Sequence, residues 1–286
     1  MKKTIYLLIA LTFIISSCDK VEGPYIEGGH DGGGEDPDTY VQKVLIEDFT
    51  AHYCVNCPRA AEQLEELVGA YGNKIIPLAL HVTSLAQPNP GVGNPYNIDF
   101  RTTVGNDLEQ EFSVLGLPIG MINRTEFGGG ILVGDGNWSS AVSEILSQTP
   151  KIGLKLDYTI DTINKKLGLE VSIKALENIL ATDKVLKLCA YITESKIIGG
   201  QKDENATGGE IINYEFNHVL RSSCNGTWGE RITDDDFIKN TTIEKSLTNV
   251  SIDSDWDFHN LGAVVFVYDS LTNEVVQAEN IELEVH

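Results

Sequence analysis

The chain has 286 residues and is strongly acidic, with 42 Asp and Glu residues, 21 Lys and Arg residues and a formal net charge of -21. Negative charge repels phosphate groups, so this composition argues against nucleic-acid binding and against electrostatic attachment to anionic lipid. No phosphate-binding or dinucleotide-binding motif is present in the sequence. We therefore expect no nucleic-acid partner and no cofactor.

The first 17 residues are typical of a secretory signal peptide. Lys2 and Lys3 precede an apolar run at 5–15, which is shorter than the about 20 residues that span a bilayer. Ser16 and Ser17 then lead to Cys18, the pattern of a bacterial lipoprotein signal, in which cleavage leaves a lipidated cysteine as the first mature residue. Ordinary secretion with cleavage nearby is the alternative. We expect acyl chains such as palmitate on Cys18 to hold the protein in the cell envelope.

The mature chain divides into a linker and two predicted domains. Residues 18–39 follow the signal peptide 1–17 and are rich in Gly and acidic residues, which is typical of a flexible linker. Residues 40–149 and 150–286 differ in their hydrophobic patterns, and each range has the length of an ordinary domain.

Strand and helix patterns alternate in residues 40–149. The predicted elements are a strand at 43–49, a helix at 59–71, a strand at 74–82, a Pro- and Gly-rich loop at 84–97, a helix at 98–114, short strands at 119–123 and 131–133, and a helix at 138–146. Pro77 weakens the second strand, because proline cannot donate a ladder hydrogen bond. This order predicts an α/β sandwich around a mixed sheet.

Strand patterns dominate residues 150–286. The predicted strands are 152–160, 166–173, 185–193, 214–221, 241–250, 262–269 and a last strand within 275–285. Little helical periodicity separates them. We therefore expect an all-β antiparallel sandwich, immunoglobulin-like in general shape, and such modules usually bind or orient other molecules.

Cys54 and Cys57 form a Cys-x-x-Cys motif between the first predicted strand and the first predicted helix. Free N–H groups and the macrodipole at a helix N-terminus favour a thiolate, so we expect Cys54 to be the reactive sulfur. Cys57 lies one turn deeper, where it can attack a mixed disulfide formed by Cys54. No second Cys/His pair stands at the spacing of a structural zinc site, and we expect no metal.

Two further side chains are candidates for the same site. Asp48 lies near the end of the strand that leads to the motif, so we expect a partly buried carboxyl group with a raised pKa that moves protons to and from Cys57. His52 is close to Cys54 and is predicted to stabilise its thiolate, with an exposed loop histidine as the alternative.

Cys189 and Cys224 are the remaining cysteines. A structural disulfide between them is one prediction, because secreted proteins fold in an oxidising compartment. Two buried free cysteines that pack as small apolar side chains are the alternative.

The segment at 48–57, DFTAHYCVNC, resembles the active-site segment of thioredoxins. Gly116-Leu117-Pro118 before a short strand resembles the cis-proline segment of the same family. The resemblance implies a thioredoxin-like fold for residues 40–149, with Pro118 beside the dithiol and shaping a groove for a polypeptide substrate. Val55-Asn56 differs from the Gly-Pro of thioredoxin, so the redox potential of that protein does not transfer.

The chain also resembles the Omp28-related outer-membrane lipoproteins. The features that carry this resemblance are the lipoprotein signal, the acidic linker, the VLIEDFT and CVNCPR segments at 44–50 and 54–59, and the NHVLR segment at 217–221. This resemblance implies a location at the outer membrane, without a defined activity.

Two functions remain open from the sequence. The first is thiol–disulfide exchange on envelope polypeptides, with Cys54 attacking, Cys57 resolving, Asp48 moving protons and Pro118 shaping the groove. The second is a non-catalytic surface protein that binds a ligand or assists assembly, in which Cys54–Cys57 is a structural disulfide. The sequence leaves open whether the chain is an enzyme.

Overall fold

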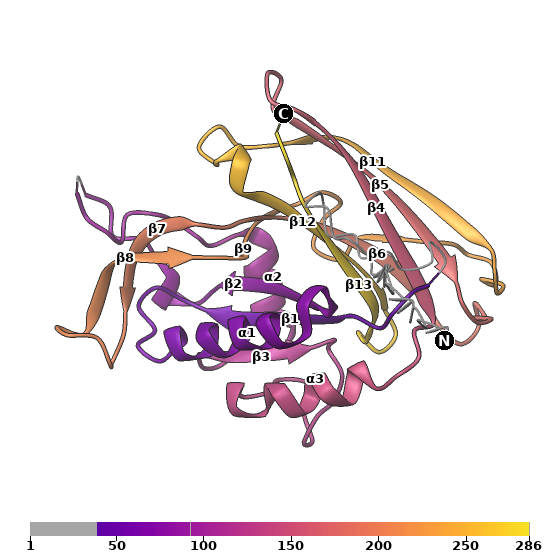
Figure 1. Cartoon of the computed structure of the whole chain (residues 1–286), viewed down its shortest axis with the longest axis horizontal. Coiled ribbons are helices and arrows are strands. Elements are labelled where there is room, and N and C mark those ends of the chain that lie inside the picture. Colours follow the sequence, from indigo (N-terminus) through magenta and orange to yellow (C-terminus); the bar gives the residue numbers. More distant parts are fainter. Residues whose placement is uncertain (1–38, 92, 286) are drawn as a thin grey trace, which may run out of the picture. The chain divides into compact units, whose positions relative to one another are not determined.

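The computed structural model describes residues 39–91 and 93–285, and Tyr40–His286 fold together as one unit (Figure 1). The strands are β1 Val44–Thr50, β2 Ile75–His81, β3 Ile119–Ile122, β4 Ile152–Asp161, β5 Lys166–Ala175, β6 Leu186–Glu194, β7 Ile197–Lys202, β8 Glu210–Phe216, β9 Val219–Ser223, β10 Glu230–Arg231, β11 Thr242–Ser251, β12 Leu261–Asp269 and β13 Val275–Glu282. The α-helices are α1 Cys57–Tyr71, α2 Thr103–Glu111 and α3 Trp138–Leu146. The predicted signal peptide, Cys18 and nearly all of the predicted linker lie outside the described residues.

One mixed sheet joins strands from both ends of the chain. Its order is β13-β12-β6-β9-β2-β1-β3, and β10 pairs with β6 beside this path. β1 and β2 run parallel, β3 is antiparallel to β1, and β9 meets β2 at a single position, where Ala79 pairs with Val219. β6 then continues the sheet by antiparallel pairing with β9 and β12.

This shared sheet contradicts the predicted fold class. We expected a thioredoxin-like α/β domain followed by a separate immunoglobulin-like sandwich, whereas strands of the C-terminal half hydrogen-bond to the sheet that the N-terminal strands begin. The prediction was wrong because hydrophobic periodicity identifies a strand but does not identify its partner. The described residues form a β-rich mixed fold, in which the α-helices α1, α2 and α3 accompany the large sheet.

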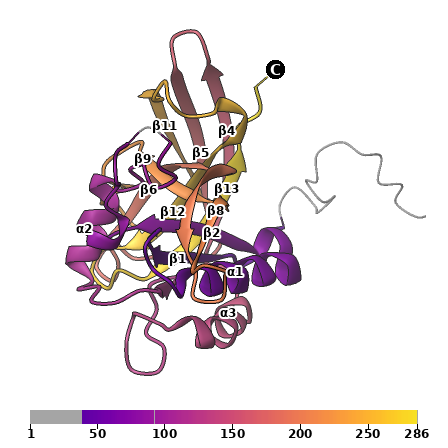
Figure 2. The ribbon, with the colours of Figure 1, turned by 90° about the vertical axis from the view of Figure 1, so that its left-hand side faces the viewer.

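A three-stranded sheet, in the order β11-β5-β4, packs on part of the large sheet (Figures 1 and 2). Its inner face contributes Leu167, Leu169 and Val171, which lie in one hydrophobic core with Ala190 and Val265 of the large sheet. β5 alternates buried residues with more exposed ones, and β4 from Lys155 onward and most of β11 alternate half-buried and exposed residues, as expected of strands with one solvent-exposed face.

A second core is shared by the two halves of the chain. Leu45 and Phe49 of β1 lie in the same cluster as Tyr191 of β6 and Phe266 of β12. The large sheet therefore curls, so that its C-terminal strands face its N-terminal strands. The start of β13 is fixed there by a hydrogen bond from the Val275 N–H to the carbonyl oxygen of Asn123 at 2.8 Å.

A buried ion pair lies inside this shared core. Arg124 donates two hydrogen bonds to Glu47 of β1, at 2.7 and 2.6 Å, and both side chains are fully buried. The guanidinium group also lies over the rings of Phe112, Phe266 and Tyr268, with 5.0–5.5 Å between the guanidinium carbon and the ring centroids. The pair thus connects the strand that leads to the cysteine motif with the C-terminal strands.

Several predicted elements differ in detail from the observed ones. The helix predicted at 98–114 begins only at Thr103, because the hydroxyl group of Thr102 accepts a hydrogen bond from Gly105 N–H and caps the helix. The strand predicted at 214–221 is split into β8 and β9 at His218, whose φ of 56° interrupts the extended chain. Residues 131–133 form a single bridge, between Val133 and Gly120, and no strand.

We predict that Arg124→Ala lowers the free energy of unfolding by about 3–5 kcal/mol, because it leaves the Glu47 carboxylate buried without a counter-ion. Chemical denaturation followed by circular dichroism measures this change. Arg101→Ala is the control, since Arg101 forms an exposed ion pair with Asp99 and should contribute less than about 1 kcal/mol.

The double variant Glu47→Leu/Arg124→Leu should recover part of the loss, because no charge stays buried. If the destabilisation of the double variant equals the sum of those measured for Glu47→Leu and Arg124→Leu, the pair has no energetic role.

Candidate functional site

The cysteine motif lies where β1 leads into α1, as the sequence predicts. Cys54 and Cys57 form a disulfide, Cys57 is the first residue of α1, and Pro58 occupies the first turn, where a missing N–H is tolerated. The loop between β1 and α1 is held by its own backbone, because the Cys54 N–H donates to the Ala51 carbonyl oxygen at 3.0 Å. The Asn56 side chain forms no capping hydrogen bond with the helix, and no acidic residue lies in its first turn.

Both cysteines are nearly buried, with 4% of Cys54 and 2% of Cys57 exposed. They pack in a small cluster with Ala51, Ala86 and the partly buried Leu117. The sequence identified the segment that contains Leu117, and the Leu117–Pro118 peptide bond is cis.

Strand register places Pro118 near the disulfide. Phe49 of β1 pairs with Ile119 of β3, so the residue before Ile119 lies beside the end of β1. The loop that carries Cys54 starts from this end. The structure therefore brings Pro118 to the end of the strand that leads to the two cysteines, so two separate segments of the chain meet there.

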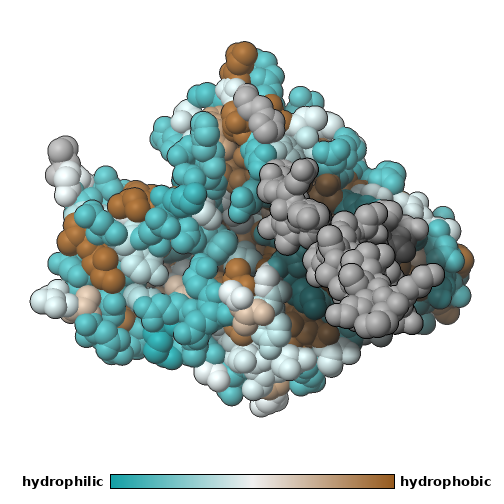
Figure 3. Space-filling view, in the orientation of Figure 1, coloured by the Kyte–Doolittle hydropathy of each residue, from teal (hydrophilic) through white to brown (hydrophobic). Residues whose placement is uncertain are grey.

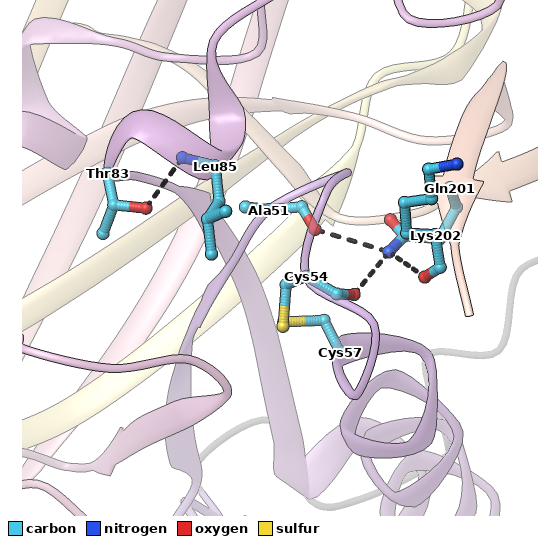
Figure 4. The surroundings of a disulfide bond; sticks show 7 residues. All are labelled: Ala51, Cys54, Cys57, Thr83, Leu85, Gln201 and Lys202. Atoms are coloured by element: carbon cyan, nitrogen blue, oxygen red, sulfur yellow. Dashed lines mark hydrogen bonds between the residues drawn. A yellow bond between two sulfur atoms is a disulfide. The ribbon is translucent and has the colours of Figure 1, made fainter. Parts of the chain in front are cut away.

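A side chain that the sequence did not identify fixes the disulfide loop. Gln201 of β7 donates from its side-chain nitrogen to the carbonyl oxygens of Cys54 at 2.9 Å and Ala51 at 3.4 Å, and of Lys202 at 2.8 Å (Figure 4). The Lys202 N–H also donates to the His52 carbonyl oxygen at 2.8 Å. The β7–β8 hairpin therefore covers the loop, and no motif in the sequence indicated this contact.

Asp48 lies on the face of the sheet that α1 covers. Side chains alternate along a strand, so Asp48 shares this face with Val44 and Ile46, which pack against α1 and α3. The carboxyl group is 2% exposed, and its Oδ1 atom has no hydrogen-bond partner. Burial, with a smaller contribution from the negative charge of Asp135, raises the pKa of Asp48 to about 7. The buried position and raised pKa that the sequence predicted for Asp48 are confirmed, and its role in proton transfer stays a prediction.

His52 has a buried environment of its own. Its side chain is fully buried, its Nε2 atom lies 3.1 Å from the Gln87 carbonyl oxygen, and its ring contacts those of Tyr53, Tyr96 and Phe100 edge-on. Burial lowers the pKa of His52 below 6.5. Burial therefore favours the neutral ring, which supplies no positive charge to a thiolate.

Cys189 and Cys224 are free cysteines in the structure, so the predicted disulfide between them is not formed. Cys189 of β6 belongs to the core shared with β1, whereas Cys224 packs against the core on the opposite face of the large sheet. Because the sheet separates the two sulfur atoms, they cannot meet without a rearrangement of β6. Both behave as small buried side chains, and burial raises the pKa of each to about 12.

Within the described residues, no group of three or more His, Cys, Asp or Glu side chains is arranged to hold a metal ion. The same part of the chain contains no helix that is long and apolar enough to cross a bilayer.

The described residues thus define a β-rich protein with a Cys-x-x-Cys disulfide at the start of its first α-helix. The family model described as outer membrane protein Omp28 matches residues 105–285, which is more than half of the chain, and the chain belongs to this family. No curated protein sequence matches it significantly. The family match begins after the disulfide, so it carries no information on the chemistry of Cys54 and Cys57.

The solved structures that superpose with a TM-score of 0.50 or more share the fold at low sequence identity. HBP35 of Porphyromonas gingivalis superposes with a TM-score of 0.62 and 17% identity, over 86% of this chain and 76% of that chain. Protein AGR_C_4864 of Agrobacterium tumefaciens gives a TM-score of 0.50 and 13% identity, over 87% of this chain and 100% of that chain. A domain of the outer membrane lipoprotein Omp28 from Porphyromonas gingivalis is 22% identical, over 47% of this chain and 89% of that domain, with a TM-score of 0.30.

Membership in the Omp28 family confirms the resemblance noted in the sequence and the predicted location at the outer membrane of the cell envelope. The lipid anchor at Cys18 lies outside the described residues and stays a prediction.

Asp48 makes the stability of the protein pH-dependent. The folded protein keeps the proton on Asp48 up to about pH 7, whereas the unfolded chain loses it near pH 4. The folded state therefore binds more protons in this window, and the contribution of Asp48 to stability falls by about 4 kcal/mol as the pH rises from about 4 to above 7.

We predict that Asp48→Asn equals the wild type in stability at pH 4 and exceeds it by up to about 4 kcal/mol at pH 8, because an amide mimics the protonated acid and cannot ionise. Denaturant unfolding at several pH values measures the difference. Asp255→Asn, which changes an exposed acid, should show no such divergence. Parallel stability curves for wild type and Asp48→Asn would contradict the raised pKa.

We predict that Gln201→Leu destabilises the protein by about 1–3 kcal/mol and speeds reduction of Cys54–Cys57 by dithiothreitol severalfold, because buried carbonyl oxygens lose their donor and the loop loosens. Alkylation of the released thiols followed by mass spectrometry gives the rate. Gln148→Leu, at an exposed position, is the matched control. An unchanged reduction rate in Gln201→Leu would show that the hairpin does not restrict access to the disulfide.

Proposed function

We propose that this outer-membrane protein exchanges disulfides with polypeptides of the cell envelope through Cys54 and Cys57. Cys18 would anchor it to the membrane by lipid, and the linker up to residue 39 would let the folded unit reach its substrates. The buried carboxyl group of Asp48 is the observation that carries this proposal.

A purely structural disulfide does not account for Asp48. Chain-entropy arguments give a disulfide across so short a loop about 2 kcal/mol of stabilisation. When the unpartnered carboxyl group ionises above pH 7, the stability of the folded protein falls by about 4 kcal/mol. A protein with leucine or asparagine at this position would be more stable above pH 7. A group that holds a proton near pH 7, in contrast, suits proton transfer to a sulfur atom.

The position of Cys54 favours attack and release at this sulfur. Cys54 lies just before the first turn of α1, a helix of 15 residues, whose N–H groups and dipole stabilise a negative charge on the sulfur. No acidic side chain in the first turn offsets this effect.

The exchange step can be written for the oxidised pair that the structure contains. A substrate thiolate attacks the Cys54 sulfur, the Cys54–Cys57 bond breaks, and Cys57 leaves as a thiolate that takes the proton from Asp48. A second substrate thiolate then attacks the substrate sulfur of the mixed disulfide and releases Cys54 as a thiolate. Two electrons pass from the substrate dithiol to the protein, and the reverse sequence reduces a substrate disulfide.

Exposed apolar side chains near the disulfide suit a polypeptide substrate. Val55, between the cysteines, is 42% exposed, and Leu115, in the loop before Pro118, is 96% exposed. Hydrophobic side chains also gather at the end of the molecule that carries β7 and β8, where Ile198 and Ile212 are about half exposed (Figure 3). Patches of this kind favour contact with another chain.

The burial of both sulfur atoms favours the second candidate function, a non-catalytic surface protein in which the disulfide is structural. The hydrogen bonds from Gln201 hold the loop in one conformation and limit access. Under this alternative, loss of the disulfide would destabilise the fold without a loss of any exchange activity.

We predict that Cys57→Ser, incubated with a peptide disulfide after reduction, accumulates a mixed disulfide at Cys54, because the resolving thiol is absent. Cys54→Ser should form none, and Cys224→Ser, which removes a cysteine outside the site, should behave as the wild type. Mass spectrometry of alkylated samples identifies the sulfur involved.

The same experiment separates the two candidate functions. If the reduced wild type fails to react with the peptide while the double variant Cys54→Ser/Cys57→Ser loses several kcal/mol of stability, the disulfide is structural and the proposal is wrong.

A further inference from the structure

A cavity of about 640 Å³ is lined by residues of α1 and β8 and by Asn217 and His218, which precede β9. The ribbon shows α1 and β8 on the same side of the molecule (Figure 1). It exists because β9 meets β2 only at Ala79, so the strands diverge there, and because Ala61 and Ala79 offer only methyl groups to fill the gap. Its volume lies within the range of small-molecule sites.

Asp48 lies among the residues that line this cavity. Only 2% of Asp48 is exposed, and its Oδ1 atom has no hydrogen-bond partner. An unpartnered carboxyl oxygen at such depth is rare in proteins, since a buried acceptor without a donor lowers stability. Asp48 therefore brings a buried carboxyl group with an unsatisfied oxygen to the wall of the cavity, and a ligand with N–H groups suits such a group.

The other polar side chains of the cavity are mainly acidic. Glu62, Glu65 and Glu66 of α1 and Glu215 of β8 line it, and all four are exposed residues. No Lys or Arg is among the lining residues, and His218 lies 3.3 Å from Glu65, with which it can pair. This charge distribution repels anions and attracts cations.

The remaining wall is apolar. Leu64 is buried in the helix face, and Tyr214 of β8 also lines the cavity. An apolar wall between a buried acid and an acidic opening fits an extended alkyl chain with a positive group at each end. A hydrated metal ion would leave this apolar surface without a partner.

We propose that this cavity binds a primary alkylammonium group, with one ammonium on Asp48, the methylene chain along Ala61, Leu64 and Tyr214, and a second ammonium among the glutamates at the opening. A linear alkyl diamine fits these features. The lysine side chain of a partner polypeptide also has an ammonium group that could meet Asp48. It has no second ammonium group at the other end of its methylene chain to meet the glutamates. This inference goes beyond disulfide exchange and shares only Asp48 with it.

The test uses isothermal titration calorimetry of the mature protein with cadaverine at pH 8. Cadaverine should bind the wild type, and Asp48→Asn should weaken this binding at least tenfold. Glu126→Gln, which removes an exposed acid outside the cavity, is the matched control for net charge and should bind as the wild type. Neutral 1,5-pentanediol should not bind.

A second variant tests the cavity without changing a charge. Ala61→Leu fills the space between Asp48 and the opening, so it should abolish binding while the protein remains folded by circular dichroism.

Titration with N-acetyl-lysine amide separates the two sources of the ammonium group, a free diamine and a lysine side chain. Tighter binding of cadaverine supports a diamine site, and tighter binding of the lysine derivative would overturn the role of the second ammonium.

The variant Cys54→Ser/Cys57→Ser distinguishes this inference from the proposed exchange activity. It should bind cadaverine as the wild type does, even if no exchange activity is found. Equal binding to wild type, Asp48→Asn and Ala61→Leu, or no binding to the wild type at millimolar cadaverine, would overturn the inference.

Discussion

The buried ion pair between Glu47 and Arg124 is the constraint on which the arrangement of the molecule depends. Two charged groups lie in a core that is otherwise apolar, and each is stable there only because the other is present. The guanidinium group is enclosed by rings from the loop after α2 and from β12, so the pair forms only when the C-terminal strands have folded against β1. The two halves of the chain are in this way parts of one folded unit.

The same strand carries the two acids that define the structural and the chemical roles of β1. Glu47 points into the shared core and is neutralised by Arg124, whereas Asp48, the next residue, points to the opposite face and lacks a hydrogen-bond partner on Oδ1. Neighbouring residues on a strand face opposite sides, so one strand fixes the sheet with one side chain and supplies a proton-carrying group with the next. The register of β1 and β3 holds Pro118 at the same end of the strand.

Local features of this fold were predictable from the sequence, and long-range ones were not. The end of β1, the start of α1, the position of Asp48 and the segment around Pro118 follow from hydrophobic patterns and motifs, and β2 forms despite Pro77. The pairing of β9 with β2 was not predictable, because it depends on one contact between residues far apart in the chain. Gln201 was missed for the same reason, since a glutamine near two glycines has no pattern that marks it as a partner of Cys54. The Cys189–Cys224 prediction failed because sequence does not tell which face of a sheet a cysteine occupies.

An equilibrium redox titration of Cys54–Cys57 in the mature protein, read by thiol alkylation and mass spectrometry, tests the central claim most directly. We expect a midpoint potential between about -120 and -270 mV, the range of known dithiol catalysts. We also expect it to depend on pH near 7 in the wild type and less so in Asp48→Asn, because the proposed mechanism passes a proton between Asp48 and Cys57. A potential below about -300 mV, typical of structural disulfides, would contradict an exchange function and leave the disulfide as a structural link between β1 and α1.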